Sequence, residues 1–303
     1  MNGSSIVFEN LKDINLAHIF ECGQCFRWEK VSENEYVGAA GDKSFRVRLE
    51  PAGCEVGKLF NLHIEATGGD EAFWRNYLDL DRDYGEIKKR ILSSCEGESS
   101  CNIKLRSALE YGYGIRILNQ DPWETFVSFI ISQNNNIPRI KKCVEALCDK
   151  YGASLTGIST AEDTNTSGIT GTGQKFAHAF PTAERLAEVP VEELRELKLG
   201  YRDEYIVAAA KRRLEMGLPA SYEEVLKYHG VGPKVANCIR LFALHETDAF
   251  PVDTWVKHIM NDMYGFDESD VMGMTDFARE KFGDYAGYAQ QYLFYYYRDR
   301  GEA

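Results

Sequence analysis

Long hydrophobic runs are missing from this chain of 303 residues. The longest apolar stretches, such as residues 129–131, are far shorter than the roughly 20 residues that a membrane-spanning helix needs. The N-terminal segment lacks a basic start followed by an apolar run, so we expect no secretory signal. Repeats and low-complexity tracts are missing too. With 44% hydrophobic residues the chain can bury a large core, and we expect a soluble, unexported protein of one large or two to three smaller domains.

Cysteine patterns that bind metals are also missing. Only two of the eight cysteines, Cys22 and Cys25, form a C-x-x-C pair, and no second pair at zinc-ligand spacing follows them. Nothing after Cys238 is cysteine, which excludes a C-terminal four-cysteine iron–sulfur signature. An unexported protein keeps its thiols reduced. We therefore expect most cysteines to act as small apolar residues, and we expect neither a metal nor another cofactor.

Positive charge is in short supply, because 35 basic residues face 47 acidic ones and leave a net charge of −12. A protein that follows phosphates is expected to be basic, so the composition argues against a nucleic-acid partner. Basic residues nevertheless gather beside the motifs described below, namely Arg139, Lys141, Lys142, Arg202, Lys211, Arg212, Arg213, Lys234, Arg240 and Lys257. The asymmetry could orient the protein on DNA; the alternative is a solvated acidic surface with an acidic partner.

Two kinds of periodicity divide the chain. Residues 5–65 alternate short β-rich segments with Gly, Asn and Asp turns, which is typical of an antiparallel sheet. From Glu71 onward the apolar period becomes helical. The sequence therefore predicts an α+β fold, with an N-terminal antiparallel sheet domain and flanking helices over residues 1–110. A mostly α-helical body follows over residues 111–303.

Local signals place several boundaries within these domains. Asp121 and Glu124 form a capping box, with proline at the first helical position, and three asparagines at 134–136 end that helix. A second helix is expected from Pro138 to about residue 151. Two segments rich in small and polar residues, 95–100 and 156–173, are predicted as loops, the second as a loop or hairpin.

The most informative segment is Tyr-His-Gly-Val-Gly-Pro-Lys at residues 228–234, followed one helix later by Pro-Val-Asp at 251–253. Glycine lets the main chain approach an anion closely, and amides at a helix start can hold one phosphate oxygen. Gly230, Val231 and Gly232 are therefore the predicted phosphate-binding hairpin. A simple tight turn is the alternative.

Lys234 and Asp253 are the candidate catalytic pair. A free lysine titrates near about 10.4, so a nucleophilic amine needs desolvation or neighbouring positive potential, and a helix N-terminus supplies such potential. Asp253 has the position of a helix N-cap, and its carboxylate could stabilise a cationic sugar or help to deprotonate the amine. The plainer alternatives are a solvated lysine and an aspartate that only caps its helix.

Residues 229–238 with 251–253 resemble the helix-hairpin-helix DNA glycosylases, and more closely the 8-oxoguanine DNA glycosylases. Further segments of this chain that resemble that family are 22–28, with Cys25 in place of its serine, 120–123, 132–140, 199–202 and 288–294. The matches run from Phe8 to Arg298. The resemblance implies a helix-hairpin-helix motif at about 222–245 in the helical glycosylase body, which also carries the C-terminal helix.

The resemblance also implies roles for single residues in the recognition of a flipped-out base. Phe294 and Cys238 would hold the base between them, Gln290 would bind its Watson–Crick edge, and the carbonyl of Gly23 would accept the N7 hydrogen that 8-oxoguanine has and guanine lacks. Helical spacing independently places Lys234 with Cys238, and Gln290 with Phe294, four residues apart on one face. The alternatives are a turn at Gly23, core positions for Cys238 and Phe294, and a surface amide for Gln290.

Four more residues match the positions that handle the gap in the duplex. Asn134 matches the hole-filling asparagine, Tyr201 the intercalating wedge, and Arg139 with Arg202 the pair that reads the orphaned cytosine. Their alternatives are a helix cap for Asn134, a buried aromatic for Tyr201, and phosphate or carboxylate partners for the arginines. Trp255 stands where the family commonly has a histidine near the target phosphate.

The expected function is excision of 8-oxoguanine, preferably opposite cytosine, with Lys234 as Schiff-base nucleophile and an associated β-elimination lyase step. A glycosylase for another damaged purine and a noncatalytic DNA-binding protein are the alternatives. The expected partner is double-stranded DNA containing oxidised guanine, with no membrane, and the chain is expected to be a monomer. We expect it in the cytoplasm with the nucleoid if prokaryotic, or in the nucleus if eukaryotic.

Overall fold

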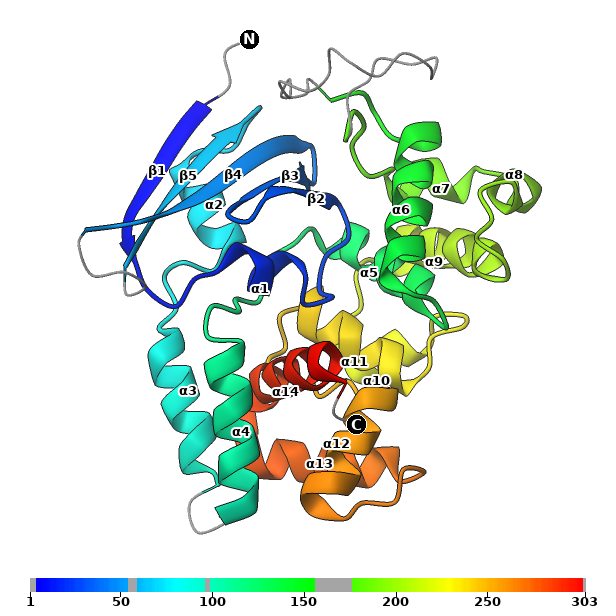
Figure 1. Ribbon diagram of the computed structural model, residues 1–303. Helices are drawn as coiled ribbons and strands as arrows, with labels where there is room; N and C mark the ends of the chain where they lie inside the picture. Colours follow the sequence, from blue (N-terminus) through cyan, green and yellow to red (C-terminus); the bar gives the residue numbers. More distant parts are fainter. Residues whose placement is uncertain (1–3, 54–58, 96–98, 156–175, 302–303) are drawn as a thin grey trace.

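The computed structural model describes residues 4–53, 59–95, 99–155 and 176–301 (Figure 1). Its N-terminal part is a five-stranded antiparallel sheet in the order β1-β5-β4-β3-β2. The strands are β1 (Ser4–Leu11), β2 (Trp28–Ser32), β3 (Glu35–Ala40), β4 (Lys43–Pro51) and β5 (Phe60–Ala66). Strands β2 to β5 form a meander, and β1 pairs with β5. The predicted antiparallel sheet is confirmed.

One face of the sheet builds its own hydrophobic core. Along β4, Phe45, Val47 and Leu49 are buried, and they alternate with more exposed residues as a period of two requires. Helices α1 (Leu16–Phe20) and α2 (Glu71–Tyr77) cover this face and contribute to the same cluster.

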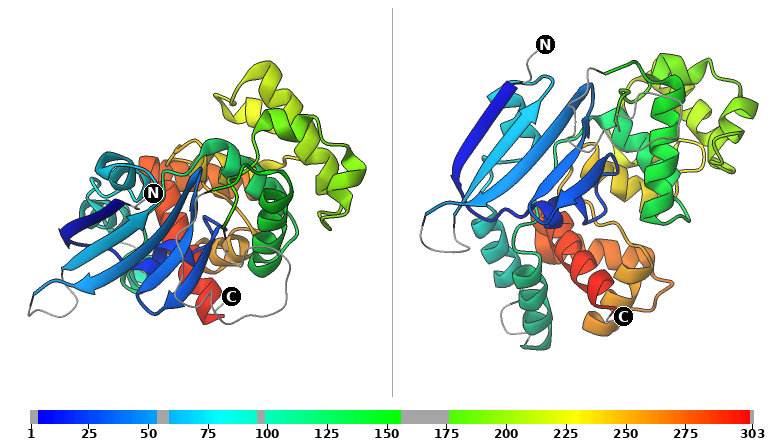
Figure 2. Two further views of the ribbon diagram at one scale, coloured as in Figure 1. Left: turned by 90° about the horizontal axis from the view of Figure 1, so that it is seen from above. Right: turned by 45° about the horizontal axis from the view of Figure 1, so that its top comes forward.

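The remaining helices form the second, larger part of the molecule. They are α3 (Tyr84–Ser93), α4 (Ser99–Tyr111), α5 (Pro122–Ser132), α6 (Ile137–Tyr151), α7 (Ala183–Ala187), α8 (Val191–Arg195), α9 (Arg202–Met216), α10 (Tyr222–Leu226), α11 (Pro233–Phe242), α12 (Thr254–Tyr264), α13 (Val271–Phe282), the 3-10 turn η1 (Gly283–Tyr285) and α14 (Ala286–Arg300). Figure 2 shows this helical body beside the sheet, with α14 close to the chain around α1. No helix in the part of the chain that the structure describes is long and apolar enough to cross a membrane.

Most of the local boundary predictions are confirmed. Asp121 caps α5 by accepting a hydrogen bond from the backbone N–H of Glu124 at 2.8 Å, with proline at the first position. Helix α6 runs to Tyr151 as expected, although its cap is Asn136. The predicted loop at 95–100 is wrong at its end, because α4 already begins at Ser99; serine costs little in a first helical turn. The predicted loop at 156–173 lies outside the described residues.

Two hydrophobic clusters divide the described chain. The sheet cluster consists of buried residues between Phe8 and Leu80, together with Leu118. The buried residues of α3 and α4 belong to the helical cluster. Helix α4 packs against α14, at the opposite end of the chain. The predicted domain boundary at residue 110 stays a prediction.

Candidate active site

The hairpin before α11 has two glycines with different jobs. Gly230 has φ +77°, and a Cβ there would lie 2.2 Å from Cε2 of Tyr205, so only glycine fits. Gly232 is the N-cap of α11, and a Cβ there would have no neighbour within 4 Å. Val231 is buried between them and anchors the turn. The open side of the hairpin therefore lies at Gly232 and the first amides of α11.

Lys234 occupies the first turn of α11, as predicted, and is partly buried. Its Nζ lies 6.0 Å from the ring centroid of Phe129 on α5. Cys238 follows one turn later and is 4% exposed. Burial raises the pKa of the Cys238 thiol, while the charge and hydrogen bonding of Lys234 oppose that rise. Because the two residues are four apart, the amine and the thiol lie on the same face of α11.

Asp253 is the N-cap of α12, as predicted, and accepts a hydrogen bond from the N–H of Val256 at 2.9 Å. Burial raises the pKa of its carboxyl group, and the amide of Val256 and the charge of Lys234 only partly offset that effect. The positive charge of Lys234 therefore acts on this carboxyl group. Amides at a helix cap lower the pKa of a carboxyl group, but at Asp253 the desolvation cost is larger.

The predicted base-recognition residues come from opposite ends of the chain. Gly23, between α1 and β2, has φ +87°, and a Cβ there would lie 3.5 Å from Cε1 of Phe294 on α14. Gln290 lies one turn before Phe294 and is 4% exposed, and its Oε1 is buried without a hydrogen-bond partner in the described structure. A surface amide at this position is therefore ruled out. Its free acceptor oxygen can take a hydrogen bond from a ligand.

The residues predicted to handle the duplex gap also gather in one place, at the α5–α6 junction and the start of α9. Asn134 has φ +46° and is exposed, and Tyr201 is 49% exposed, so Tyr201 is not a buried aromatic. Arg139 is exposed and donates one hydrogen bond, at 3.3 Å, to the carbonyl of Lys198.

Arg202 differs from Arg139 because it points inward. Its side chain is 5% exposed, and its guanidinium donates to the carbonyls of Leu199 at 3.0 Å, Gln133 at 3.0 Å and Asn134 at 3.1 Å. Arg202 thus fixes the backbone beside Asn134. Its partners are neither the phosphate nor the carboxylate considered from the sequence.

Another basic residue near the motifs is also engaged inside the protein. Arg240 is 8% exposed and pairs with Glu246 and Asp248. Although Arg240 lies beside the motifs in the sequence, its guanidinium is engaged by acids of the protein. The loop after α11 lies beside Arg240, because the N–H of Glu246 donates to the carbonyl of Arg240 at 2.9 Å.

The C-x-x-C pair of Cys22 and Cys25 shows no feature of a reactive site. Both thiols are buried and unoxidised, and burial raises the pKa of each. Cys22 belongs to the helical cluster and Cys25 to the sheet cluster, so the two side chains enter different cores. Within the described ranges no group of three His, Cys, Asp or Glu side chains could hold a metal ion.

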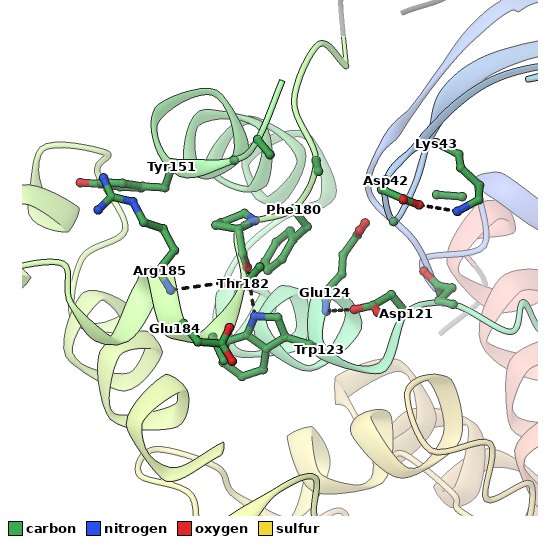
Figure 3. A pocket seen from close by; sticks show the side chains of 18 of the residues that line it. Asp42, Lys43, Asp121, Trp123, Glu124, Tyr151, Phe180, Thr182, Glu184 and Arg185 are labelled. Atoms are coloured by element: carbon green, nitrogen blue, oxygen red, sulfur yellow. Dashed lines mark hydrogen bonds and ion pairs between the residues drawn. The ribbon is translucent and has the colours of Figure 1, made fainter. Parts of the chain in front are cut away.

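A cavity of about 960 Å³ lies between the sheet and helices α5 to α7 (Figure 3), away from all the predicted site residues. Glu124 points into this region and lies near Arg27, at 3.8 Å in an ion pair. Burial raises the pKa of Glu124 to about 7, although Arg27 opposes the rise. Beyond the role of Glu124 in the capping box, no pattern in the sequence singles out this pair.

Two buried glutamines around Gly23 were also missed from the sequence. Gln24 is fully buried, and its side-chain amide donates to the carbonyls of Ile19 at 2.9 Å and Arg116 at 2.7 Å. Gln291, 2% exposed, donates from Nε2 to the carbonyl of Cys22 at 2.7 Å. Their position inside motif-bearing segments was the only available signal, because the partners are distant in sequence.

Comparison with known proteins agrees with this arrangement. Residues 6–126 match the 8-oxoguanine DNA glycosylase N-terminal domain, and residues 127–283 match the HhH-GPD superfamily of base excision DNA repair proteins. The N-glycosylase/DNA lyase of Saccharomyces cerevisiae is 31% identical over 275 residues, covering 82% of this chain and 68% of the yeast protein. The N-glycosylase/DNA lyase of Arabidopsis thaliana is 27% identical over 318 residues, covering 93% and 77%.

A solved structure extends the likeness to the whole chain. The 8-oxoguanine glycosylase/lyase of Clostridium acetobutylicum, in complex with double-stranded DNA containing cytosine opposite 8-oxoG, is 36% identical with a TM-score of 0.79. The match covers 99% of this chain and 100% of that one. The chain belongs to the HhH-GPD superfamily of base excision DNA repair proteins, and within it to the 8-oxoguanine DNA glycosylases. The predicted class of enzyme, a DNA glycosylase with lyase activity, is confirmed.

Proposed function

We propose that this protein removes 8-oxoguanine opposite cytosine from duplex DNA and then cleaves the strand at the resulting site. The observation that carries the proposal is the position of Lys234 and Asp253 at the N-terminal ends of α11 and α12. Lys234 lies in the first turn of α11, and Cys238 follows one turn later on the same face. Asp253 caps α12, where burial raises the pKa of its carboxyl group and the charge of Lys234 partly offsets that rise. The glycosylase/lyases similar to this chain act on the same lesion by name.

Lys234 is the nucleophile in this mechanism. The lone pair of its neutral amine forms a bond to C1′ of the flipped nucleotide while the bond from C1′ to the base breaks, and the departing base keeps that electron pair and takes a proton. Asp253, as a carboxylate, stabilises the positive charge that develops on the sugar. The amine loses its proton, the sugar ring opens, and a Schiff base forms. Loss of a C2′ proton then expels the 3′ phosphate by β-elimination.

Base selection follows from the residues around Gly23. Gln290 has the free buried oxygen to bind the Watson–Crick edge, and Phe294 offers its ring to the base face. The carbonyl of Gly23 accepts the N7 hydrogen of 8-oxoguanine. Guanine has a lone pair at N7, so the same carbonyl repels it, at a cost of about 1–3 kcal/mol.

The remaining roles concern the DNA that stays behind. Asn134 fills the hole in the stack, Tyr201 wedges beside it, and Arg139 reads the orphaned cytosine. Arg202, which the resemblance pairs with Arg139 in this role, instead holds the backbone beside Asn134. The exposed positions of Asn134, Arg139 and Tyr201 support these roles. Gly230, Val231 and Gly232 bind a phosphate through the open side of the hairpin. We propose that the protein acts as a monomer in the compartment that holds its DNA.

A single-turnover assay tests the proposal on duplexes that carry 8-oxoguanine opposite each of the four bases. We expect excision to be fastest opposite cytosine, and borohydride to trap the protein on that DNA. Lys234→Gln should abolish the trap and leave binding intact. A trap that persists at full yield in this variant would refute the lysine assignment.

The same assay separates the two other functions that the sequence left open. Excision of an alkylated purine in preference to 8-oxoguanine would identify a glycosylase for another base. Binding without excision of any base would identify a noncatalytic DNA-binding protein.

A further inference from the structure

We propose that Gln291 is a positioning residue that sets how well the enzyme distinguishes 8-oxoguanine from guanine. It ties the loop at Cys22 and Gly23 to α14, the helix that carries Gln290 and Phe294. The inference rests on the proposed function, because it concerns the geometry of the same base pocket. Gln291 itself does not touch the base in this proposal.

The tether is one buried hydrogen bond between the two ends of the chain. Nε2 of Gln291 donates to the carbonyl of Cys22 at 2.7 Å across 269 residues of sequence, and both residues are at most 2% exposed. Gln291 follows Gln290 directly, so it projects about 100° around the helix from the base-binding pair. Helix α14 thus presents Gln290 and Phe294 on one face and Gln291 on the adjacent face.

The loop is also held on the other side of Gly23. The Gln24 side chain donates to the carbonyls of Ile19 and Arg116, and its Oε1 accepts from the N–H of Leu118 at 2.9 Å. The peptide before Gly23 is therefore fixed by Gln291, and the residue after it by Gln24. Gly23, with φ +87°, is the one soft position between these anchors.

Discrimination by a single hydrogen bond needs such anchors. The Gly23 carbonyl must remain in place when guanine presents a lone pair, because a carbonyl that can withdraw relieves the repulsion and accepts the wrong base. Groups that act in recognition must be held to within about 0.5 Å by the residues behind them. Loss of the Gln291 hydrogen bond frees the peptide before Gly23. The affinity for guanine should therefore rise, and the affinity for 8-oxoguanine should change less.

The experiment measures binding, so that it does not depend on catalysis. In the Lys234→Gln background, the Kd is measured for otherwise identical duplexes with 8-oxoguanine or guanine opposite cytosine. Gln291→Met keeps the side-chain length but has no N–H donor, and Gln291→Asn keeps the amide but falls one methylene short. We expect both variants to lower the ratio of the Kd for guanine to the Kd for 8-oxoguanine by about 10-fold, mainly through tighter binding of guanine.

Tyr151→Phe is the control, because Tyr151 is also buried and its hydroxyl donates to Glu193 at 3.3 Å, at the C-terminal end of α6 and not to the segments that hold Gly23. It should lose stability and keep the Kd ratio. An unchanged ratio in a folded Gln291→Asn or Gln291→Met protein would overturn the tether. Equal affinity of the Lys234→Gln parent for both duplexes would instead overturn the proposed function, so the two failures are distinguishable.

Discussion

Arg202→Ala should destabilise the protein strongly, whereas Arg139→Ala should not, although both arginines match positions that read the same cytosine. The difference lies in their surroundings. Arg202 is 5% exposed and supplies donors to three backbone carbonyls. Arg139 is exposed and supplies one donor at 3.3 Å.

The magnitude follows from those three carbonyls. A hydrogen bond to a charged group contributes about 1.5–3 kcal/mol, but truncation also removes the desolvation cost of the guanidinium, and water can reach part of the space it leaves. We therefore expect Arg202→Ala to lower the free energy of unfolding by about 2–4 kcal/mol, and Arg139→Ala to change it by less than about 0.5 kcal/mol. Arg202→Lys should lie close to Ala, because one ammonium cannot satisfy three divergent carbonyls.

Urea unfolding of the three variants measures these values, and binding to 8-oxoguanine duplexes with each opposite base measures the functional effect. Arg139→Ala should lose the preference for cytosine. Arg202→Ala should weaken binding to all four duplexes, because the backbone at Gln133 and Asn134 loses its support. Equal unfolding free energies for Arg139→Ala and Arg202→Ala would refute the reasoning, since water would then replace the guanidinium without cost.

Three further predictions concern the hairpin and two buried acids. Gly230→Ala should lower the free energy of unfolding by about 2–4 kcal/mol, because the added Cβ would meet Tyr205. Gly232→Ala should unfold like the parent but bind DNA more weakly. Equal urea midpoints for the two variants would contradict this. The pKa of Glu124 is raised to about 7, so its ionisation destabilises the folded protein as the pH rises above about 4.5. The unfolding free energy of Glu124→Gln should match that of the parent at about pH 4.5 and exceed it by up to about 3 kcal/mol at about pH 8. A difference that does not change with pH would be inconsistent with this. Asp253→Asn keeps an acceptor for the helix cap and removes a buried charge whose desolvation raises the carboxyl pKa. Its unfolding free energy at about pH 7 should therefore equal or exceed that of the parent, while the rate of excision falls roughly 100-fold. A clear loss of stability would argue against this account.

The sequence predicted well wherever the signal is local. The caps at Asp121 and Asp253 and the first-turn proline of α5 depend on residues within one helical turn, and all are present. The alternation along β4 likewise needs only the pleat of a strand. These signals sufficed for the α+β class and for the placement of Lys234 at the start of a helix. The catalytic and recognition roles stay predictions.

What the sequence could not give is the direction in which a long polar side chain points. Arg202 reaches carbonyls 68 and 69 residues earlier in the chain, and Arg240 turns to acids brought back by a loop. An arginine in a motif has the same local pattern whether it faces DNA or its own backbone. The pairing is decided by tertiary contacts, so a charge count along the sequence overstates the cations free to meet phosphate.

The position of Gly23 gives these long-range contacts their importance. Cys22 packs into the helical core and Cys25 into the sheet core, so the chain crosses between the two clusters within three peptide bonds. Gly23 sits at this crossing with a positive φ, and the other parts of the proposed base pocket belong to α11 and α14. Any shift of one core against the other would therefore act on the Gly23 carbonyl first. Buried hydrogen bonds from both sides, by Gln24 and Gln291, are what such a crossing needs if it is to recognise one hydrogen atom.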